Sequence, residues 1–467
     1  MLAAAVCLVF APGCVSRRSA DSFDKIRTAV GSRAGQRIVW HQDKADFTVA
    51  TERVNALLAE DLSLEHAVEI ALINNPRLQA TYESIGVAEA QVVEAMLPPN
   101  PSFEALYKNI RHGGHIWELM LVQEVVDLVM IPWRKQAAEL GAERVRAEVT
   151  ASVLDILLDV KVAYRDAQAS AQVLRTVRTT RKSEEAAYGM AQELRNAGNI
   201  SKLQLKGRRA VLEQARLAES SAELQLAERR EALNILLGLL GEQAAWQIAT
   251  DLPPPSDEML SYAEIRQAAE KNSLDLAMAR ATLLQVAEEE GITNVTSILP
   301  ELHLGVEGER EPDGTWVVGP MIEFPLPLFD WGQAERAIAR SAVRRASDMY
   351  VATAVKLDAA ARLTARRLEL TGRQAADYAE TMLPLQKELT RETQLHFNAM
   401  QLGVFQLLAA KKEELAVQRQ YINALRNFWI AQAEAEHLMN GRMLDASAVA
   451  ARDPMGMGGA SQGQGGH

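Results

Sequence analysis

The chain is poor in cysteine and in aromatic residues. Of its 467 residues only two are cysteine, Cys7 and Cys14, and only 5% are aromatic. Two cysteines within the first fifteen positions supply neither a disulfide framework nor a cysteine-based metal site. Because 48% of the residues are apolar but few are bulky, an ordinary globular core is disfavoured. Ala, Leu, Glu and Arg are the commonest residues, which is typical of long helices packed side by side.

Excess positive charge and long apolar runs are also missing. The chain has 50 basic and 61 acidic residues, a net charge of −11, which disfavours nucleic acid as a partner. After the N-terminus no stretch of about 18 uncharged apolar residues occurs, so the sequence predicts no transmembrane helix. It also has no nucleophile elbow, P-loop, Rossmann glycine run or HExxH motif, which argues against an enzyme and against a bound cofactor.

The N-terminus has the features of an export signal. The apolar run in residues 1–13 is too short to span a bilayer, which takes about 20 residues, but it has the length of a signal peptide. It ends in Ala11-Pro12-Gly13-Cys14, which resembles a bacterial lipobox. This predicts acylation of Cys14, palmitate included, and a lipidated segment over residues 14–61. Because Val15 is not Asp, we expect sorting to the outer membrane. The alternative is an unmodified apolar stub.

The rest of the chain reads as two repeats of one design. Asn75 and Asn272 are 197 residues apart, and Pro98 and Pro300 are 202 apart. Each repeat is predicted to contain a helix, a strand hairpin and a long helical hairpin. The first repeat covers residues 62–258, with its strand hairpin at 102–130 and its helical hairpin at 133–238, followed by a linker. The second covers 259–441, with its hairpins at 301–324 and 333–440, and a flexible tail follows at 442–467.

The helical hairpins carry a coiled-coil period. In the long helix, nine apolar residues recur with a mean spacing of 3.5, which favours a left-handed supercoil with a neighbouring helix. In the returning helix, four apolar residues are seven apart, which predicts an antiparallel hairpin. The first set is Val149, Val153, Ile156, Val160, Ala163, Ala167, Ala171, Leu174 and Val177, and the second is Leu203, Ala210, Leu217 and Leu224.

The strands are predicted to have one apolar face and one polar face that is exposed to water. Apolar residues at 302, 304 and 306 alternate with His303, Gly305 and Glu307. Strands with an apolar outer face enter a membrane only as a closed barrel, because lipid cannot satisfy open edges. Four strands are too few, since the smallest barrels have about eight. Several copies must therefore share one barrel, and three copies of four strands would supply twelve.

On this repeat, motifs occur in an order that resembles the TolC-type outer-membrane efflux factors. The resemblance runs from residue 62 to about 441 and is closest to the heavy-metal efflux branch. Its motifs are Ser63-Leu-Glu-His-Ala67, Asn75-Pro-Arg-Leu78, Ala197-Gly-Asn-Ile-Ser201, Ala232-Leu-Asn-Ile-Leu-Leu-Gly238, Phe324-Pro-Leu-Pro-Leu-Phe-Asp330 and Phe397-Asn-Ala-Met-Gln-Leu-Gly-Val-Phe-Gln-Leu-Leu408.

The resemblance implies a mainly α fold with a small β part. Duplicated coiled-coil hairpins would form a trimeric α-barrel, and four strands per chain would contribute to a shared 12-stranded transmembrane β-barrel. It further implies a lipid-anchored outer-membrane exit duct with a large periplasmic portion, passively conducting substrate, heavy-metal ions in this branch. The implied partners are a homotrimer, a periplasmic adaptor (membrane fusion protein), an inner-membrane transporter of the resistance-nodulation-division type and outer-membrane lipid.

The resemblance also assigns site residues. The adaptor-docking tips are Gly198, Asn199, Ile200, Ser201 and Leu203 in the first hairpin and Leu402, Gly403, Val404 and Phe405 in the second. The gate candidates are Gln204, where relatives have an acidic residue, Met400 and Gln401. The pore-lining candidates are Glu307 and Glu323. The alternatives are plain turns and coiled-coil packing at the tips, and solvated charges without selectivity on the strands.

Two histidine-containing segments are interpreted as non-functional. His112 and His115 flank a Gly-Gly turn and make an incomplete metal site, so we expect a surface loop there. Met455, Met457 and His467 belong to the flexible tail. The alternative for the whole chain is a lipid-anchored periplasmic coiled-coil scaffold or adaptor without a pore. That alternative gives no reason for alternating strands at corresponding places in both repeats.

Overall fold

The computed structural model describes residues 13–110, 114–248, 251–255, 260–298, 301–326 and 328–444. These residues fall into two compact units. The first comprises the described parts of Met1–Ala29, Ala80–Thr150 and Leu274–Lys356, and the second those of Val30–Gln79, Ala151–Ser273 and Leu357–His467. Within the described residues, none of the helices combines the length and hydropathy needed to cross a membrane.

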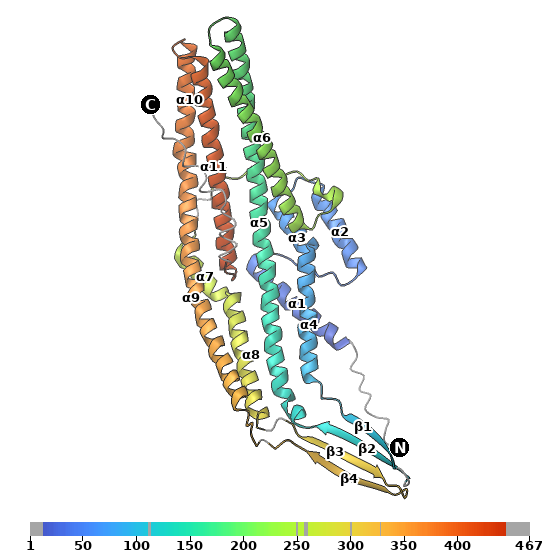
Figure 1. Cartoon of the computed structure of the whole chain (residues 1–467). Coiled ribbons are helices and arrows are strands. Elements are labelled where there is room, and N and C mark those ends of the chain that lie inside the picture. The colour runs from blue at the N-terminus through green and yellow to red at the C-terminus, as the bar shows by residue number, and fades with distance from the viewer. Residues whose placement is uncertain are drawn as a thin grey trace. The chain divides into compact units, whose positions relative to one another are not determined.

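The elements follow the repeat expected from the sequence (Figure 1). The first repeat contains α3 Leu64–Asn74, α4 Pro76–Met96, β1 Ser102–Ile110, β2 Gly114–Glu124, α5 Val126–Asn196 and α6 Lys202–Leu237. The second contains α7 Tyr262–Asn272, α8 Leu274–Thr296, β3 His303–Arg310, β4 Trp316–Glu323, α9 Gln333–Asp377, α10 Leu383–Asn398 and α11 Val404–Met439. A 3₁₀ turn, Gly241–Ala244, follows α6, and a π turn, Tyr378–Met382, joins α9 to α10.

The structure refines several predicted boundaries for identifiable reasons. The first helix, expected over 62–96 with a bend or interruption at Pro76, is two helices, because Asn75 leaves the helical region just before Pro76. The helix expected over 261–290 is likewise divided at Ser273. The strand arm expected to reach residue 130 ends at Glu124, and α5 begins at Val126 with Pro132 inside its second turn. The long helix of the second repeat is interrupted where the sequence allowed it, by the π turn just before Pro384, while Gly372 lies within α9.

The N-terminal segment is helical, which the sequence reading missed. The sequence analysis predicts no helix in the segment over residues 14–61, whereas α1 covers Gly13–Ala34 and α2 covers Lys44–Leu58. In the first unit α1 is held by Glu89 of α4, whose side chain is 3% exposed. Arg18 Nε and Arg146 Nη1 donate to it at 2.9 and 3.2 Å, and Ser22 Oγ at 2.5 Å. These pairs link α1, α4 and α5 through polar groups that no local pattern identifies.

The four strands of the first unit form one antiparallel sheet in the order β1-β2-β3-β4 (Figure 1). The register aligns Leu121 with Phe103 on β1 and with Val306 on β3, and Val306 with Pro320 on β4. Because side chains alternate between the two faces of a strand, these apolar residues share one face. The predicted alternation of β3 is confirmed, and β1 and β4 are the two edges of the sheet.

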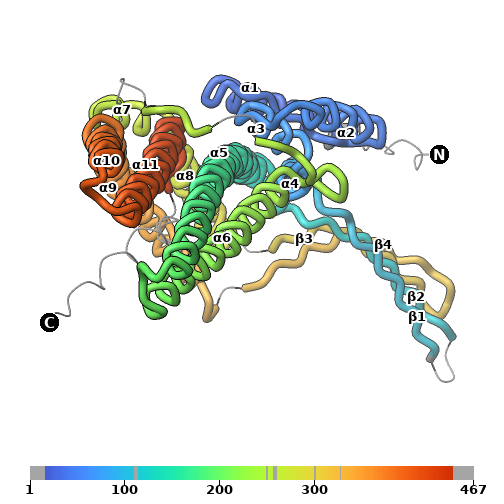
Figure 2. Tube along the Cα trace, turned by 90° about the horizontal axis from the view of Figure 1, so that it is seen from above, coloured from blue at the N-terminus to red at the C-terminus, as the bar shows by residue number. Residues whose placement is uncertain are grey.

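The second unit contains the hairpin of α5 with α6 and that of α10 with α11, which run side by side in both views (Figures 1 and 2). Seven of the nine predicted seam residues of α5 are buried, while Ala163 and Ala171 are partly buried. The predicted stripe of α6 is wrong as an internal seam. Leu203, Leu217 and Leu224 are 81%, 69% and 61% exposed. The α6 side chains that pack on α5 are instead Ala222 and Leu226.

The two repeats close their helical hairpins in the same way. Asn74 Nδ2 donates to Leu237 O at 2.9 Å and to Gly238 O at 2.8 Å, at the end of α6. Asn272 Nδ2 donates to Met439 O at 2.8 Å, at the end of α11. These amides satisfy carbonyl groups that a helix C-terminus leaves without partners. Each repeat therefore fastens its short helix to the end of its own long hairpin.

Gly441→Ala is expected to destabilise the second unit by about 2 kcal/mol. At φ 104° Gly441 has a backbone that L-residues rarely adopt, and an added Cβ would lie 1.9 Å from Asn272 O. Gly241→Ala is the control, because its φ is 58° but the space around it is open, so only about 1 kcal/mol is expected. Urea unfolding followed by tryptophan fluorescence measures both. Equal losses would show that the close approach to Asn272 does not matter.

Candidate functional site: the hairpin tips and the two faces of the sheet

The first tip is a compact, hydrogen-bonded turn. After α5 ends, Asn199 N donates to Leu194 O at 2.8 Å and Gly198 N donates to Arg195 O at 3.0 Å. This is the Schellman arrangement, and Gly198 has the left-handed backbone it requires, with φ 78°. The next helix starts with a capping box. Ser201 Oγ accepts from Gln204 N at 3.2 Å, and Ser201 N donates to Gln204 Oε1 at 2.8 Å.

The second tip repeats this geometry 202 residues later. Gln401 N donates to His396 O and Met400 N to Phe397 O, both at 2.9 Å. Gly403 N donates to Gln406 Oε1 at 2.8 Å, which corresponds to the bond between Ser201 and Gln204. Met400 occupies the position of Gly198 and has φ 62°, the one positive φ of a non-glycine residue in the described ranges. The tips are therefore structural equivalents.

Met400→Gly is expected to stabilise the second tip, and Gly198→Ala to destabilise the first, each by about 1 kcal/mol or less. A side chain in the left-handed region is strained, and glycine removes that strain at some cost in unfolded-state entropy. Hydrogen exchange of the amides at 400 and 401, and at 198 and 199, reports each local opening. Faster exchange at the second tip of Met400→Gly would contradict the expectation.

The predicted tip residues are largely exposed. Leu203 is 81% and Met400 94% exposed, while Leu402, Val404 and Phe405 are partly buried. The side-chain oxygen of Gln204, a gate candidate, is already bonded to the Ser201 backbone. Gln401 Oε1 lies 2.5 Å from His396 Nδ1. The two gate candidates with an amide side chain, Gln204 and Gln401, thus use that side chain to hold their own turns.

One contact that the sequence analysis missed links the second tip to the first hairpin. The guanidinium carbon of Arg208, on α6, lies 4.0 Å from the ring centroid of Phe405, on α11. This is a cation–π geometry. Arg208 could not be found from spacing, because its partner lies almost 200 residues away. The capping glutamine Gln204 could have been found, since Ser201-x-x-Gln204 is a capping-box pattern.

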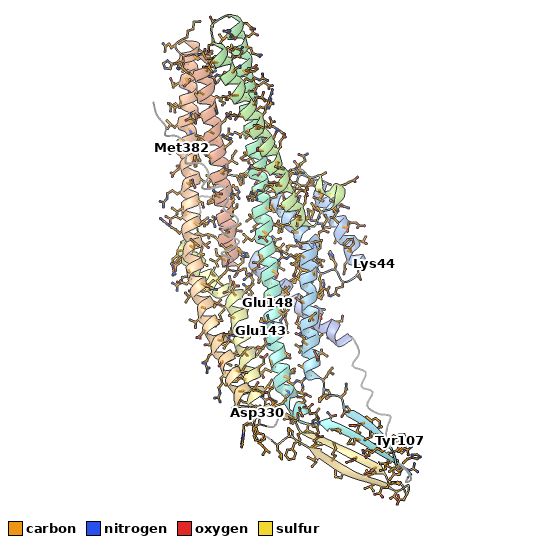
Figure 3. All side chains as sticks on the ribbon, in the orientation of Figure 1. Lys44, Tyr107, Glu143, Glu148, Asp330 and Met382 are labelled. Carbon is orange, nitrogen blue, oxygen red and sulfur yellow. The ribbon has the colours of Figure 1, made fainter. Side chains whose placement is uncertain are left out.

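The two faces of the sheet differ, because the acidic residues of its strands all lie on one of them. One face carries Leu304, Val306, Val318 and Ile322, which are 41–67% exposed. At the far end of this face lies an aromatic row of Tyr107, Trp117 and Trp316, beside Arg310. Figure 3 labels Tyr107 there. The opposite face carries the acidic residues of the strands, interspersed with apolar ones such as Leu106, Val122 and Val317; the acidic residues are Glu104, Glu118, Glu124, Glu307, Glu309 and Glu323.

The register brings the pore-lining candidates to the same face. Glu307 is paired with Met120 and Gly319, and Glu323 is paired with His303. Because residues 303 and 307 are an even number apart on β3, both glutamates share the acidic face. Lys108 neutralises one carboxylate on this face through an ion pair with Glu118. The face as a whole remains negatively charged.

The remaining candidates are not assembled into a site by the described structure. His115 Nδ1 lies 2.6 Å from the hydroxyl of Tyr107, and His112 lies outside the described residues. Cys14 is in the first turn of α1, but its side chain lies outside the described part, as do Cys7, Met455, Met457 and His467. Within the described ranges no group of three or more His, Cys, Asp or Glu side chains could hold a metal ion.

Duplicated long helical hairpins and an antiparallel sheet of four strands make this chain similar to known outer-membrane channel proteins. The family model described as outer membrane efflux protein matches residues 67–239. Over 396 residues the chain is 24% identical to the cobalt-zinc-cadmium resistance protein CzcC of Cupriavidus metallidurans, covering 82% of this chain and 90% of that protein. The chain is therefore related to the outer membrane efflux proteins, and the resemblance found in the sequence is confirmed.

Solved structures show the same fold. The CmeC outer membrane channel of Campylobacter jejuni has a TM-score of 0.68 at 16% identity, covering 89% of this chain and 92% of that one. The open state of the MtrE outer membrane channel of Neisseria gonorrhoeae has a TM-score of 0.64 at 17% identity, covering 81% and 89%. The predicted fold class, mainly helical with four antiparallel strands, is confirmed.

Proposed function

We propose that the protein is the outer-membrane exit duct of a tripartite efflux pump and conducts substrate passively from the periplasm to the exterior. The observation that carries this function is the sheet, whose apolar face suits lipid and whose acidic face suits water. A scaffold or adaptor without a pore has no use for such a sheet. The relationship to outer membrane efflux proteins supports the same function, and proteins of this family are channels rather than enzymes.

The duct is a homotrimer. One chain supplies four strands whose edges, β1 and β4, have no further partner in the described sheet. Lipid cannot satisfy open edges, so β4 of one copy pairs with β1 of the next and twelve strands close the barrel. The exposed residues Leu217 and Leu224 on α6 are the corresponding contact between copies in the helical part.

The two tips dock a periplasmic adaptor, which connects the duct to an inner-membrane transporter of the resistance-nodulation-division type. This role is supported by the structural equivalence of the two tips and by the exposure of their residues. The contacts are made by Gly198, Asn199, Ile200, Ser201 and Leu203 and by Leu402, Gly403, Val404 and Phe405. Gln204, Met400 and Gln401 lie beside them at the gate. Acylation of Cys14 anchors the chain to the outer membrane.

The substrate is a heavy-metal cation. Glu307 and Glu323 line the pore on the acidic face, which favours cations over anions. The curated relative is a cobalt-zinc-cadmium resistance protein. The metal is cargo, so the duct needs only a negative lining that attracts it and no tight site.

Deleting the gene and measuring resistance and cellular accumulation for cobalt, zinc, cadmium, copper and several drugs tests this function. We expect greater sensitivity and accumulation for divalent metals, restored by the intact gene. Restoration is expected to fail with Leu203→Asp at a tip and to succeed with Leu97→Asp, an exposed leucine away from the tips. An unchanged metal profile would remove the metal assignment, and an unchanged profile for every compound would remove the duct.

A further inference from the structure

A cavity whose lining includes four charged side chains lies within the second unit, between α5, α6 and α11. Its volume is about 320 Å³, and it is lined by Asp166 of α5, Arg229 of α6, and Arg419 and Arg426 of α11. It is separated along α5 from the tip, because Asp166 lies 30 residues before Asn196. The cavity is therefore a different site from the docking tips and from the acidic face of the sheet.

The charged lining of this cavity is unbalanced. Three arginines face one carboxylate, which gives the charged side chains a net charge of +2. Asp166 is fully engaged, since its Oδ1 lies 2.5 Å from Arg426 Nε and its Oδ2 lies 3.3 Å from Arg229 Nη1. Arg419 Nε is buried and has no hydrogen-bond partner among the described residues. One guanidinium of the lining thus has a buried donor that no acceptor of the described residues satisfies.

A cavity with this chemistry repels metal cations and attracts oxyanions. Guanidinium groups present parallel N–H donors that match the two oxygens of a carboxylate or phosphate. Neutral side chains in the lining, Gln420 and Asn423 among them, add further donors. A buried donor without an acceptor is unfavourable, and a bound oxyanion removes that penalty.

We propose that Arg229, Arg419 and Arg426 form an oxyanion-binding site that joins the first helical hairpin to the second. The ligand chemistry is a phosphate or carboxylate group. It has two possible sources, a free inorganic anion or an acidic side chain of a second copy of the chain. The first source does not depend on the proposed function, because the lining residues all belong to one unit of one chain; the second source rests on the proposed homotrimer.

The test compares thermal unfolding of the purified full chain in chloride and in inorganic phosphate at equal ionic strength. For the native chain we expect a saturable rise in Tm of at least about 2 °C with phosphate. Arg419→Gln is expected to weaken the apparent phosphate affinity at least tenfold. In chloride it is expected to be no less stable than the native chain, because it removes repulsion. Arg209→Gln, an exposed arginine of α6, is the matched control and keeps the phosphate response.

Native mass spectrometry of the same variants distinguishes the two sources. A phosphate response lost only in Arg419→Gln assigns the site to a free anion. No phosphate response, combined with loss of the oligomer in Arg419→Gln but not in Arg209→Gln, assigns it to a carboxylate of a second copy. If phosphate has no effect and the oligomer of Arg419→Gln is intact, the proposal is wrong.

Discussion

Asp166→Ala is expected to lower the free energy of unfolding of the second unit by about 3–5 kcal/mol. The side chains of Asp166 and Arg426 are only 9% and 8% exposed, and their atoms are 2.5 Å apart. Removing the carboxylate leaves Arg426 buried with no charge partner and also removes the ion pair to Arg229. The desolvation of a buried, unpaired guanidinium is the dominant cost. Guanidinium chloride unfolding in phosphate-free buffer, followed by tryptophan fluorescence, measures the loss.

Asp251→Ala supplies the control for this prediction. Asp251 pairs with Arg175, which lies on α5 as Asp166 does, but the side chains of Asp251 and Arg175 are 65% and 62% exposed. Solvent screens such a pair, so its removal should cost less than about 1 kcal/mol. Comparable losses for the two variants would mean that burial of Asp166 does not decide the energetics. A small loss for Asp166→Ala alone would show that Arg426 relaxes into water.

The features that the sequence predicted correctly are those with local causes. Gly198 lies in the hairpin tip that the sequence places at residues 198–203, and it has the left-handed backbone that a Schellman turn needs. The alternation of Leu304 and Val306 with His303 and Glu307 placed two faces on β3, and the register confirms them. Turn chemistry and residue periodicity depend on neighbours a few positions away, which a single sequence displays in full.

The features that the sequence missed depend on partners far along the chain. Glu89 and Arg18 are 71 residues apart, and Asp166 and Arg426 are 260 apart. No spacing rule connects such residues, because only the packed helices bring them together. The apolar stripe of α6 shows a different limit of prediction from sequence. Its period of seven predicted that an apolar face exists, but a period does not say which neighbour that face will meet, and here it is exposed.

Val306→Arg is expected to prevent assembly of the protein in the outer membrane. Val306 is 52% exposed at the middle of β3, in the apolar row with Leu121 and Pro320. If this face meets lipid, an arginine near the bilayer midplane costs about 2–4 kcal/mol per copy, and three copies share the barrel. The amount of heat-resistant oligomer in the outer-membrane fraction measures assembly.

Glu307→Arg, the substitution at the next position, tests whether the two faces of β3 meet different surroundings. Glu307 differs from Val306 by one position and points to the opposite face of the same strand, so the same charged side chain is introduced into water. We expect Glu307→Arg to assemble normally and to shift the conductance of the reconstituted channel from cations toward anions. If both variants assembled equally well, the apolar face would not meet lipid. If both failed, the acidic face would not line a water-filled pore, and the assignment of the two faces would have to be abandoned.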